Sequence, residues 1–223
     1  MEKVVCNENI DFNIVNKIKK MDFKIIKSLK DDKRSKVTLI EIDKNKYVYK
    51  IPKEKNKRIW QRIISLVRGS ESKREYENYL RIQELGFRGP IPVMYWEKKI
   101  FGICIDSFLV SFYLEGNPAT KNELDKVEKE LRNIHEKGYL HGDSQLNNFI
   151  IKNDETYLID AKLIKNRYKR AGEAYEFIYL EESCHEEINI YDKKGLSYKL
   201  AKGLNSYLHW IGRMKKTIRG KER

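Results

Sequence analysis

The chain has 223 residues, 40% of them hydrophobic, and its 46 lysine and arginine residues against 33 aspartate and glutamate residues give a formal net charge of +13 at pH 7. This length suits one large domain or two smaller lobes that share a cleft, and the apolar fraction is enough for a core. Because the sequence shows neither a secretory signal pattern nor a run of about 18 apolar residues, we expect no export signal and no transmembrane helix.

The predicted elements of the first half are mostly strands. Residues 10–22 are expected to form a helix or a loosely attached arm. Alternating, β-branched segments between polar turns then predict strands, and the first three of these should form an antiparallel meander that stops at Pro52. The expected strands are 23–29, 37–42, 47–51, 91–99 and 106–114, and the expected helices are 58–69 and 71–86.

The second half is predicted to be mainly helical. The segment EGNP, residues 115–118, breaks the pattern and marks the expected lobe boundary. A long amphipathic helix over 121–138 should follow, and after it come a polar loop and a short hairpin whose second strand, TYLID, ends in Asp160. From about residue 165 the chain is expected to be mostly helical.

The excess of positive charge favours an acidic partner, which would be nucleic acid, an anionic membrane surface or a phosphorylated substrate. Residues 44–74 hold eleven basic and two acidic side chains, and residues 212–223 hold six basic and one acidic. General lysine enrichment is the alternative explanation for the overall excess. The three cysteines, Cys6, Cys104 and Cys184, are scattered and odd in number. They indicate reduced thiols in a cytoplasmic protein.

The polar loop YLHGDSQLNNFI, residues 139–150, carries the strongest chemical signal. Asp143 and Asn148 lie just before the first hairpin strand, and Asp160 ends the second, so the three side chains can converge at one end of the hairpin. Two carboxylates and an amide oxygen suit Mg²⁺, or one carboxylate can accept a proton from a hydroxyl group. Phosphoryl transfer needs both kinds of group.

These residues resemble a known pattern. The loop HGDSQLNNF matches H-G-D-x-x-x-x-N, and with the downstream YLID it resembles the catalytic loop and metal-binding aspartate of the protein-kinase-like superfamily, in its bacterial small-molecule branch. The compact length, KREYENYLRIQELG and the basic segment after the third strand are similar to the lipopolysaccharide core kinases, and most of all to the heptose kinases of the inner core. The resemblance covers the whole chain.

The resemblance implies an α+β, two-lobed protein-kinase-like fold: a nucleotide-binding N-lobe of an antiparallel sheet and one main helix, and a compact, mostly helical C-lobe. It also implies roles for the matching residues. Lys50, oriented by Glu75, would hold the phosphates of ATP, Asn148 and Asp160 would hold Mg²⁺, and Asp143 would be the catalytic base. The expected parts are an N-terminal arm or helix over 1–22, the N-lobe over 23–115 and the C-lobe over 116–223.

Neighbouring residues offer alternatives to some of these assignments. Glu77 competes with Glu75, and the register of the helix favours Glu75. Asn147 adjoins Asn148, which the five-residue spacing favours. We interpret His141 as a structural prop of the loop, not as a proton carrier. The run Cys184–Glu187 lacks a second ligand pair at zinc spacing, so no zinc site is expected there.

The sequence also departs from the kinase pattern. The segment KDDKRSK, residues 30–36, has no glycine where many kinases cover the nucleotide with a glycine-rich loop, so the charges of Lys33, Arg34 or Lys36 are candidates to act instead. Asp160 is followed by Ala161 and not by Phe-Gly. The part of the chain after Asp160 is too short for the large helical subdomain of protein kinases, which argues against a peptide substrate.

The implied acceptor is an anionic glycolipid or sugar at the cytoplasmic face of the inner membrane. Packing on the N-lobe is the favoured explanation of the apolar stripe in the basic, amphipathic segment 53–74, and contact with that membrane is the alternative. Other classes considered are a kinase of soluble small molecules such as aminoglycosides, a non-catalytic kinase-like binding protein, and a nuclease or other nucleic-acid binder. We expect no nucleic-acid partner, because a nuclease has no need of Lys50 and Glu75.

Overall fold

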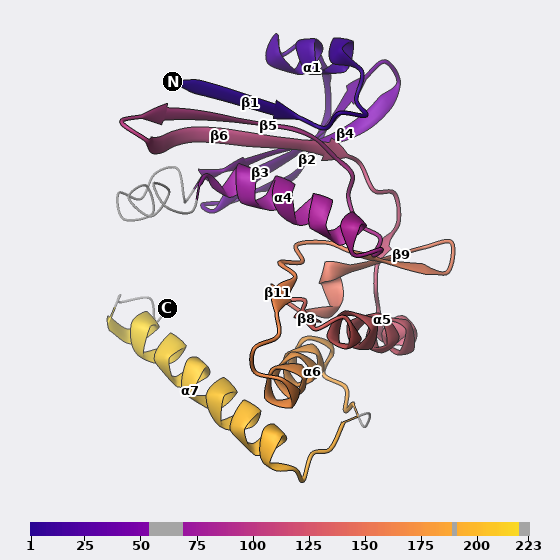
Figure 1. The fold of residues 1–223 in the computed structure, drawn as a ribbon, viewed down its shortest axis with the longest axis vertical. Helices are drawn as coiled ribbons and strands as arrows, with labels where there is room; N and C mark the ends of the chain where they lie inside the picture. The colour runs from indigo at the N-terminus through magenta and orange to yellow at the C-terminus, as the bar shows by residue number, and fades with distance from the viewer. Residues whose placement is uncertain (54–68, 189–190, 219–223) are drawn as a thin grey trace. The chain divides into compact units, whose positions relative to one another are not determined.

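The computed structural model describes the chain except for residues 54–68, 189–190 and 219–223 (Figure 1). The chain divides into two compact units, Met1–Glu115 and Gly116–Arg223, which we call unit 1 and unit 2. The expected helix over 58–69 and most of the basic segment 53–74 lie outside the described residues.

Unit 1 is built on a six-stranded antiparallel sheet with the order β1-β5-β6-β4-β3-β2. The predicted meander is confirmed, since β2 pairs with β3 and β3 with β4. The strands are β1 Glu2–Cys6, β2 Lys24–Asp31, β3 Ser35–Ile42, β4 Asn45–Pro52, β5 Pro92–Ile100 and β6 Ile103–Phe112.

Two helices cover opposite faces of this sheet, α1 (Phe12–Lys19) and α4 (Glu71–Glu84), as Figure 1 shows. On the α1 face, Val15 and Ile18 pack into a core with sheet residues such as Tyr47 and Met94. Successive strand residues point to opposite faces, so Tyr49 joins that core while Lys50 points to the α4 face. The strand period therefore places Lys50 against α4.

The first 22 residues differ in part from the expected arm. The helix is present as α1, but residues 2–6 form an edge strand, β1, which pairs with β5 from Glu2↔Lys98 to Cys6↔Met94. The run EKVVC lacks the polar alternation of a half-buried strand, and its partner lies far along the sequence, so no local pattern indicated the pairing. Residues 1–22 are consequently part of the core of unit 1.

Unit 2 combines helices with short strands. The hairpin β9–β10 extends to β7 in a three-stranded sheet, and β8 pairs with β11. A 3-10 turn with a capping box between Thr120 and Glu123 starts the long helix α5. The elements are β7 Asn117–Pro118, α5 Leu124–Glu136, β8 Tyr139–Leu140, β9 Phe149–Lys152, β10 Glu155–Leu158, β11 Ile164–Lys165, α6 Arg170–Cys184 and α7 Leu196–Ile218.

Helix α7 packs one side on α6, where Ala201 joins a small core with Ala174 and Ile178. Another side of α7 leaves a row of large apolar residues exposed, namely Leu196, Leu200, Leu204, Tyr207, Leu208, Trp210 and Met214. Among the helices that the structure describes, none has the length and apolar character needed to cross a membrane.

Candidate active site

Lys50 and Glu75 form an ion pair within unit 1. Lys50 Nζ lies 2.7 Å from Glu75 Oε1, and the two side chains are only 22% and 14% exposed. Tyr79, one turn further along α4, donates its hydroxyl hydrogen to the same Glu75 oxygen at 2.7 Å. Glu77, by contrast, faces Lys73 at 3.5 Å near the surface. The structure thus pairs Lys50 with Glu75 and holds the carboxylate from two sides.

The turn between β2 and β3 contains no glycine and is held by the side chain of Asp32. Asp32 Oδ1 accepts hydrogen bonds from the backbone N–H groups of Arg34 at 2.7 Å and Ser35 at 2.8 Å. These bonds hold the pKa of Asp32 below its ordinary value. An aspartate side chain that caps its own turn fixes the backbone without a positive φ, so the turn is ordered although it contains no glycine.

In unit 2, the loop that carries Asp143 is closed by its own side chains. Asn148 Nδ2 donates to the backbone oxygen of Asp143 at 2.9 Å, which bridges the five-residue spacing. Asp143 Oδ1 accepts from Gln145 Nε2 at 3.1 Å, and within the described residues its Oδ2 has no hydrogen-bond partner. Asn147 is exposed. The geometry therefore sets Asn148, and not Asn147, against Asp143.

Asp160 reaches the same end of the hairpin as Asn148. β9 and β10 pair from Phe149↔Leu158, and the Ile159 N–H group donates to the Asn148 carbonyl oxygen at 2.9 Å. The second strand ends at Leu158, two residues earlier than expected, because Asp160 turns into the left-handed region with φ 53°. Few residue types besides glycine adopt this conformation readily, and aspartate is one of them.

The oxygen atoms at this hairpin end fit a Mg²⁺ ion. Asn148 uses its Nδ2 on the loop, so its Oδ1 is available as a ligand, and Asp160 supplies a carboxylate. Two protein oxygens suffice, because Mg²⁺ is commonly held by one or two carboxylates together with phosphate oxygens and water. Among the described residues no group of three or more His, Cys, Asp or Glu side chains could hold a metal alone.

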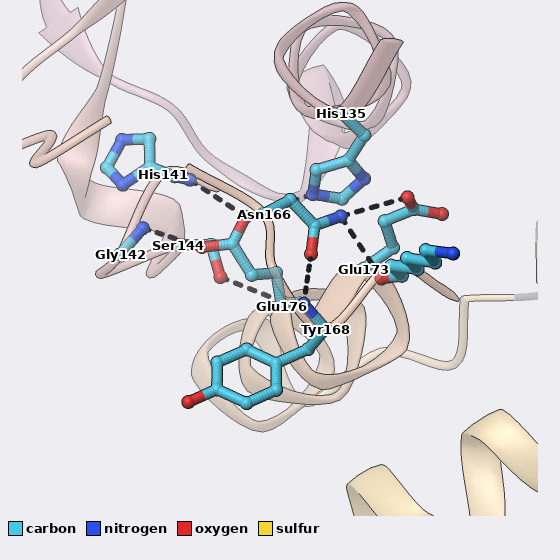
Figure 2. Close-up of polar contacts among 9 residues, drawn as sticks. His135, His141, Gly142, Ser144, Asn166, Tyr168, Glu173 and Glu176 are labelled. Atoms are coloured by element: carbon cyan, nitrogen blue, oxygen red, sulfur yellow. Dashed lines mark hydrogen bonds and ion pairs between the residues drawn. The ribbon is translucent and has the colours of Figure 1, made fainter. Parts of the chain in front are cut away.

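A buried glutamate that the sequence analysis missed fixes the backbone of this loop. Figure 2 shows Glu176, from α6, reaching the segment before Asp143. Its carboxylate accepts hydrogen bonds from the backbone N–H groups of His141 at 2.9 Å and Gly142 at 2.6 Å, and it lies 2.9 Å from His135 Nε2. The Glu176 carbonyl oxygen accepts from Ser144 Oγ at 2.8 Å. Glu176 thus anchors the residues on both sides of Asp143, His141 and Gly142 before it and Ser144 after it.

His141 is fully buried, and its ring packs on Phe149 with the ring centroids 4.9 Å apart. Burial lowers its pKa to about 4, against the opposing charges of Glu176, Asp143 and Asp160. The side chain is therefore neutral at pH 7, and neither ring nitrogen has a hydrogen-bond partner among the described residues. These features fit a packing role and not proton transfer.

Comparisons with known proteins bear on the family and the fold of this chain. The family model described as "Lipopolysaccharide core biosynthesis protein (WaaY)" matches residues 3–211. The structure "WaaP in complex with acyl carrier protein" is similar over 99% of this chain and 100% of that one, with a TM-score of 0.53 and 16% identity. A search of curated proteins found no relative with significant similarity.

Two kinase structures are also similar, at lower scores. A thermostable mutant of the aminoglycoside phosphotransferase APH(4)-Ia has a TM-score of 0.49 and 10% identity over 75% of this chain and 79% of that one. The PknI kinase domain of Mycobacterium tuberculosis, as its C20A_R136A mutant, has a TM-score of 0.45 and 14% identity over 82% and 94% of the two chains. The chain has the α+β, protein-kinase-like fold that the sequence predicted.

Proposed function

The chain belongs to the WaaY family of lipopolysaccharide core biosynthesis proteins, and from this premise we propose that it is a kinase that transfers the γ-phosphoryl group of ATP to a sugar hydroxyl group, in a heptose of the inner core. The observation that carries the proposal is the hydrogen bonding of the two carboxylate oxygens of Asp143. One carboxylate oxygen is held by Gln145, and the other has no partner within the described residues. An acceptor hydroxyl group can therefore hydrogen bond to a base that is already oriented.

In the proposed reaction, the oxygen atom of the sugar hydroxyl group forms a bond to the γ-phosphorus while the bond from that phosphorus to the β–γ bridging oxygen breaks. The hydroxyl proton passes to Asp143 Oδ2, and ADP leaves with the electrons of the broken bond. Because such transition states are largely dissociative, Asp143 orients the hydroxyl group early and takes its proton late.

The Lys50–Glu75 pair is proposed to hold the α- and β-phosphates. The ammonium group sits on the stiff sheet, and Glu75, itself held by Tyr79, limits its movement. The exposed basic residues of the turn Lys33–Lys36 are candidates for further phosphate contacts. A Mg²⁺ ion held by Asn148 and Asp160 would neutralise charge on the transferred phosphate.

Replacement of Asp143 tests this assignment. Asp143→Asn should lower phosphate transfer from radiolabelled ATP to purified core oligosaccharide by at least about a hundredfold, because the base is lost, while the affinity for ATP is retained. Asp160→Asn should instead weaken ATP binding in a Mg²⁺ titration followed by thermal shift. Asp154→Asn is the matched control, since Asp154 lies in the hairpin turn, where it pairs with Lys126 at 2.5 Å. Full turnover by Asp143→Asn would refute the proposal.

Peripheral attachment to an anionic membrane surface is the second part of the proposal. The exposed apolar row of α7 follows one side of the helix, and the exposed Lys199, Lys202 and Arg213 lie beside it. The sequence 196–218 contains no acidic residue. A helix of this kind lies in the interface with its apolar side in the acyl boundary and its basic residues at lipid phosphates.

Vesicle co-sedimentation tests the membrane surface. The double change Leu200→Gln and Leu204→Gln should release the protein from vesicles that contain anionic phosphatidylglycerol, with little change in the melting temperature, because both side chains are exposed. Phe101→Ser removes an even more exposed apolar side chain from unit 1 and should leave binding intact. Unchanged binding by the α7 variant would refute the assignment. Binding to acyl carrier protein, the partner in the WaaP structure, in place of vesicles would also do so.

A further inference from the structure

A pocket of about 360 Å³ opens beside Asp143 within unit 2. Its wall includes the tyrosines of α6, Tyr175 and Tyr179, and the residues after the hairpin, Lys162 and Ile164. Glu176 also lines the pocket, and its carboxylate is already engaged by the loop backbone and His135. The pocket adjoins the one reactive carboxylate of the proposed kinase, so what it can bind bears on the acceptor.

A hydrogen-bonded chain connects the pocket wall to the proposed base. Gln145 Nε2 donates to Asp143 Oδ1 at 3.1 Å and to the hydroxyl oxygen of Tyr179 at 2.8 Å. A carboxylate only accepts hydrogen bonds, so the amide nitrogen must face Asp143. The amide thereby uses its hydrogens on these two partners. The Tyr179 hydroxyl group accepts from Gln145, and among the described residues its own hydrogen has no acceptor, so it can be donated to a ligand.

The pocket is also lined by a cation, Lys162, that has no acidic partner among the described residues. Lys162 is exposed, and in the described part of the chain the only hydrogen-bond acceptor of its Nζ is the Gly142 carbonyl oxygen at 3.2 Å. Lys121, Lys126 and Lys193 of the same unit, by contrast, pair with carboxylates. The ammonium group of Lys162 is therefore available to an anion that enters the pocket.

The tyrosines offer an apolar surface of the size of a sugar ring. Tyr175 and Tyr179 are one helical turn apart, and their rings are nearly parallel, with centroids 6.3 Å apart and 10° between the planes. Both side chains are half-buried, so their positions are restrained while part of each remains accessible. Ligand sites commonly combine aromatic walls with a few polar groups that fix orientation.

We propose that this pocket binds the acceptor as a sugar that carries an acidic substituent, a phosphate or a carboxylate, close to the hydroxyl group that is phosphorylated. Lys162 binds the acidic substituent, and Tyr175 and Tyr179 contact the sugar ring. Gln145 holds Asp143 in position beside that ring. This inference rests on the proposed kinase function. It adds that Lys162 determines specificity for an acidic acceptor.

The test compares acceptors with and without acidic groups. Purified, deacylated core oligosaccharide serves as the acidic acceptor. The same material after removal of phosphate with hydrofluoric acid, after reduction of its carboxyl groups, and after both treatments gives three matched acceptors. Lys162→Ala should raise KM for the untreated acceptor by roughly ten- to a hundredfold, the effect of losing one charge-assisted hydrogen bond. KM for ATP should not change.

The treated acceptors identify the acidic group. If phosphate is recognised, wild-type protein should show the raised KM after dephosphorylation, and Lys162→Ala should cause no further loss; if carboxylate is recognised, reduction gives that result. Lys162→Arg should restore much of the affinity. Lys165→Ala, a nearby exposed lysine in β11 that does not line the pocket, is the control and should behave as wild type.

Other results would overturn the inference. An equal loss of kcat on all four acceptors would mean that Lys162 contacts the transferred phosphoryl group, and no change would remove it from the site. In both cases wild-type transfer would persist and the kinase function would stand. Wild-type protein that transfers phosphate to none of the acceptors would overturn the kinase function and this inference together.

Discussion

Replacing Glu176 should damage both stability and catalysis, because one buried carboxylate serves three donors. In Glu176→Gln the amide oxygen can still accept from the Gly142 N–H group, and His135 can change tautomer to accept from the new amide. The His141 N–H group is then left facing an N–H donor. A buried unsatisfied donor costs about 1–3 kcal/mol, and exchanging a charged acceptor for a neutral one costs about 1 kcal/mol more.

The free energy of unfolding of unit 2 should therefore fall by roughly 2–4 kcal/mol in Glu176→Gln, as measured by urea denaturation followed by circular dichroism. Turnover should fall as well, since the backbone just before Asp143 loses its anchor. Glu173→Gln is the matched control on the same helix: Glu173 accepts a hydrogen bond from Asn166 at 3.0 Å, which a glutamine oxygen can still accept. A loss below about 1 kcal/mol in Glu176→Gln would refute this reasoning.

Two further changes test other parts of the site. Lys50→Ala should lower the initial rate of transfer at limiting ATP at least about tenfold, because one charged phosphate contact is lost. Glu75→Gln should lower this rate less, and Glu77→Gln should not change it. A larger loss in Glu77→Gln than in Glu75→Gln would contradict the pairing of Lys50 with Glu75. Because the pKa of His141 is lowered from 6.5 to about 4 in the folded chain, the unfolded chain binds this proton first as pH falls. Stability should thus drop between about pH 6.5 and 4, by roughly 3 kcal/mol. Denaturation across this range should show a shallower drop for His141→Phe, and an unchanged slope would exclude His141 as the cause.

The sheet of unit 1 could be predicted in part because local chemistry specifies it. Alternation in VTLIEI and the polar turns around it indicated the meander β2–β4, and an apolar period with a terminal glycine indicated α4. The order β1-β5-β6-β4-β3-β2 could not be predicted in the same way. It depends on which edges remain open after distant segments meet, and that information is not local.

Some residues of the candidate site could likewise be predicted from local patterns, and others could not. Lys50 and Glu75 could be paired because a strand period and a helix register each fix one direction, and the geometry agrees. Glu176 was missed, because a glutamate within a helix usually faces water. A signal existed, however: Leu180 lies one turn after it and Phe177 beside it, so the helix period placed this carboxylate on a buried side. Gln145 gave no such signal, since its role depends on Tyr179 from another element.

The position of β1 has a consequence for how the chain is made. Glu2 pairs with Lys98, so β1 leaves the ribosome before its partner and waits until about ninety more residues have been added, on the order of 5–20 s at typical rates of synthesis. The meander β2–β4 is complete long before that. Unit 1 should therefore begin to fold as a smaller sheet, and the late arrival of β5 and β6 should make closure of the β1 edge the slow, topology-limited step of its folding.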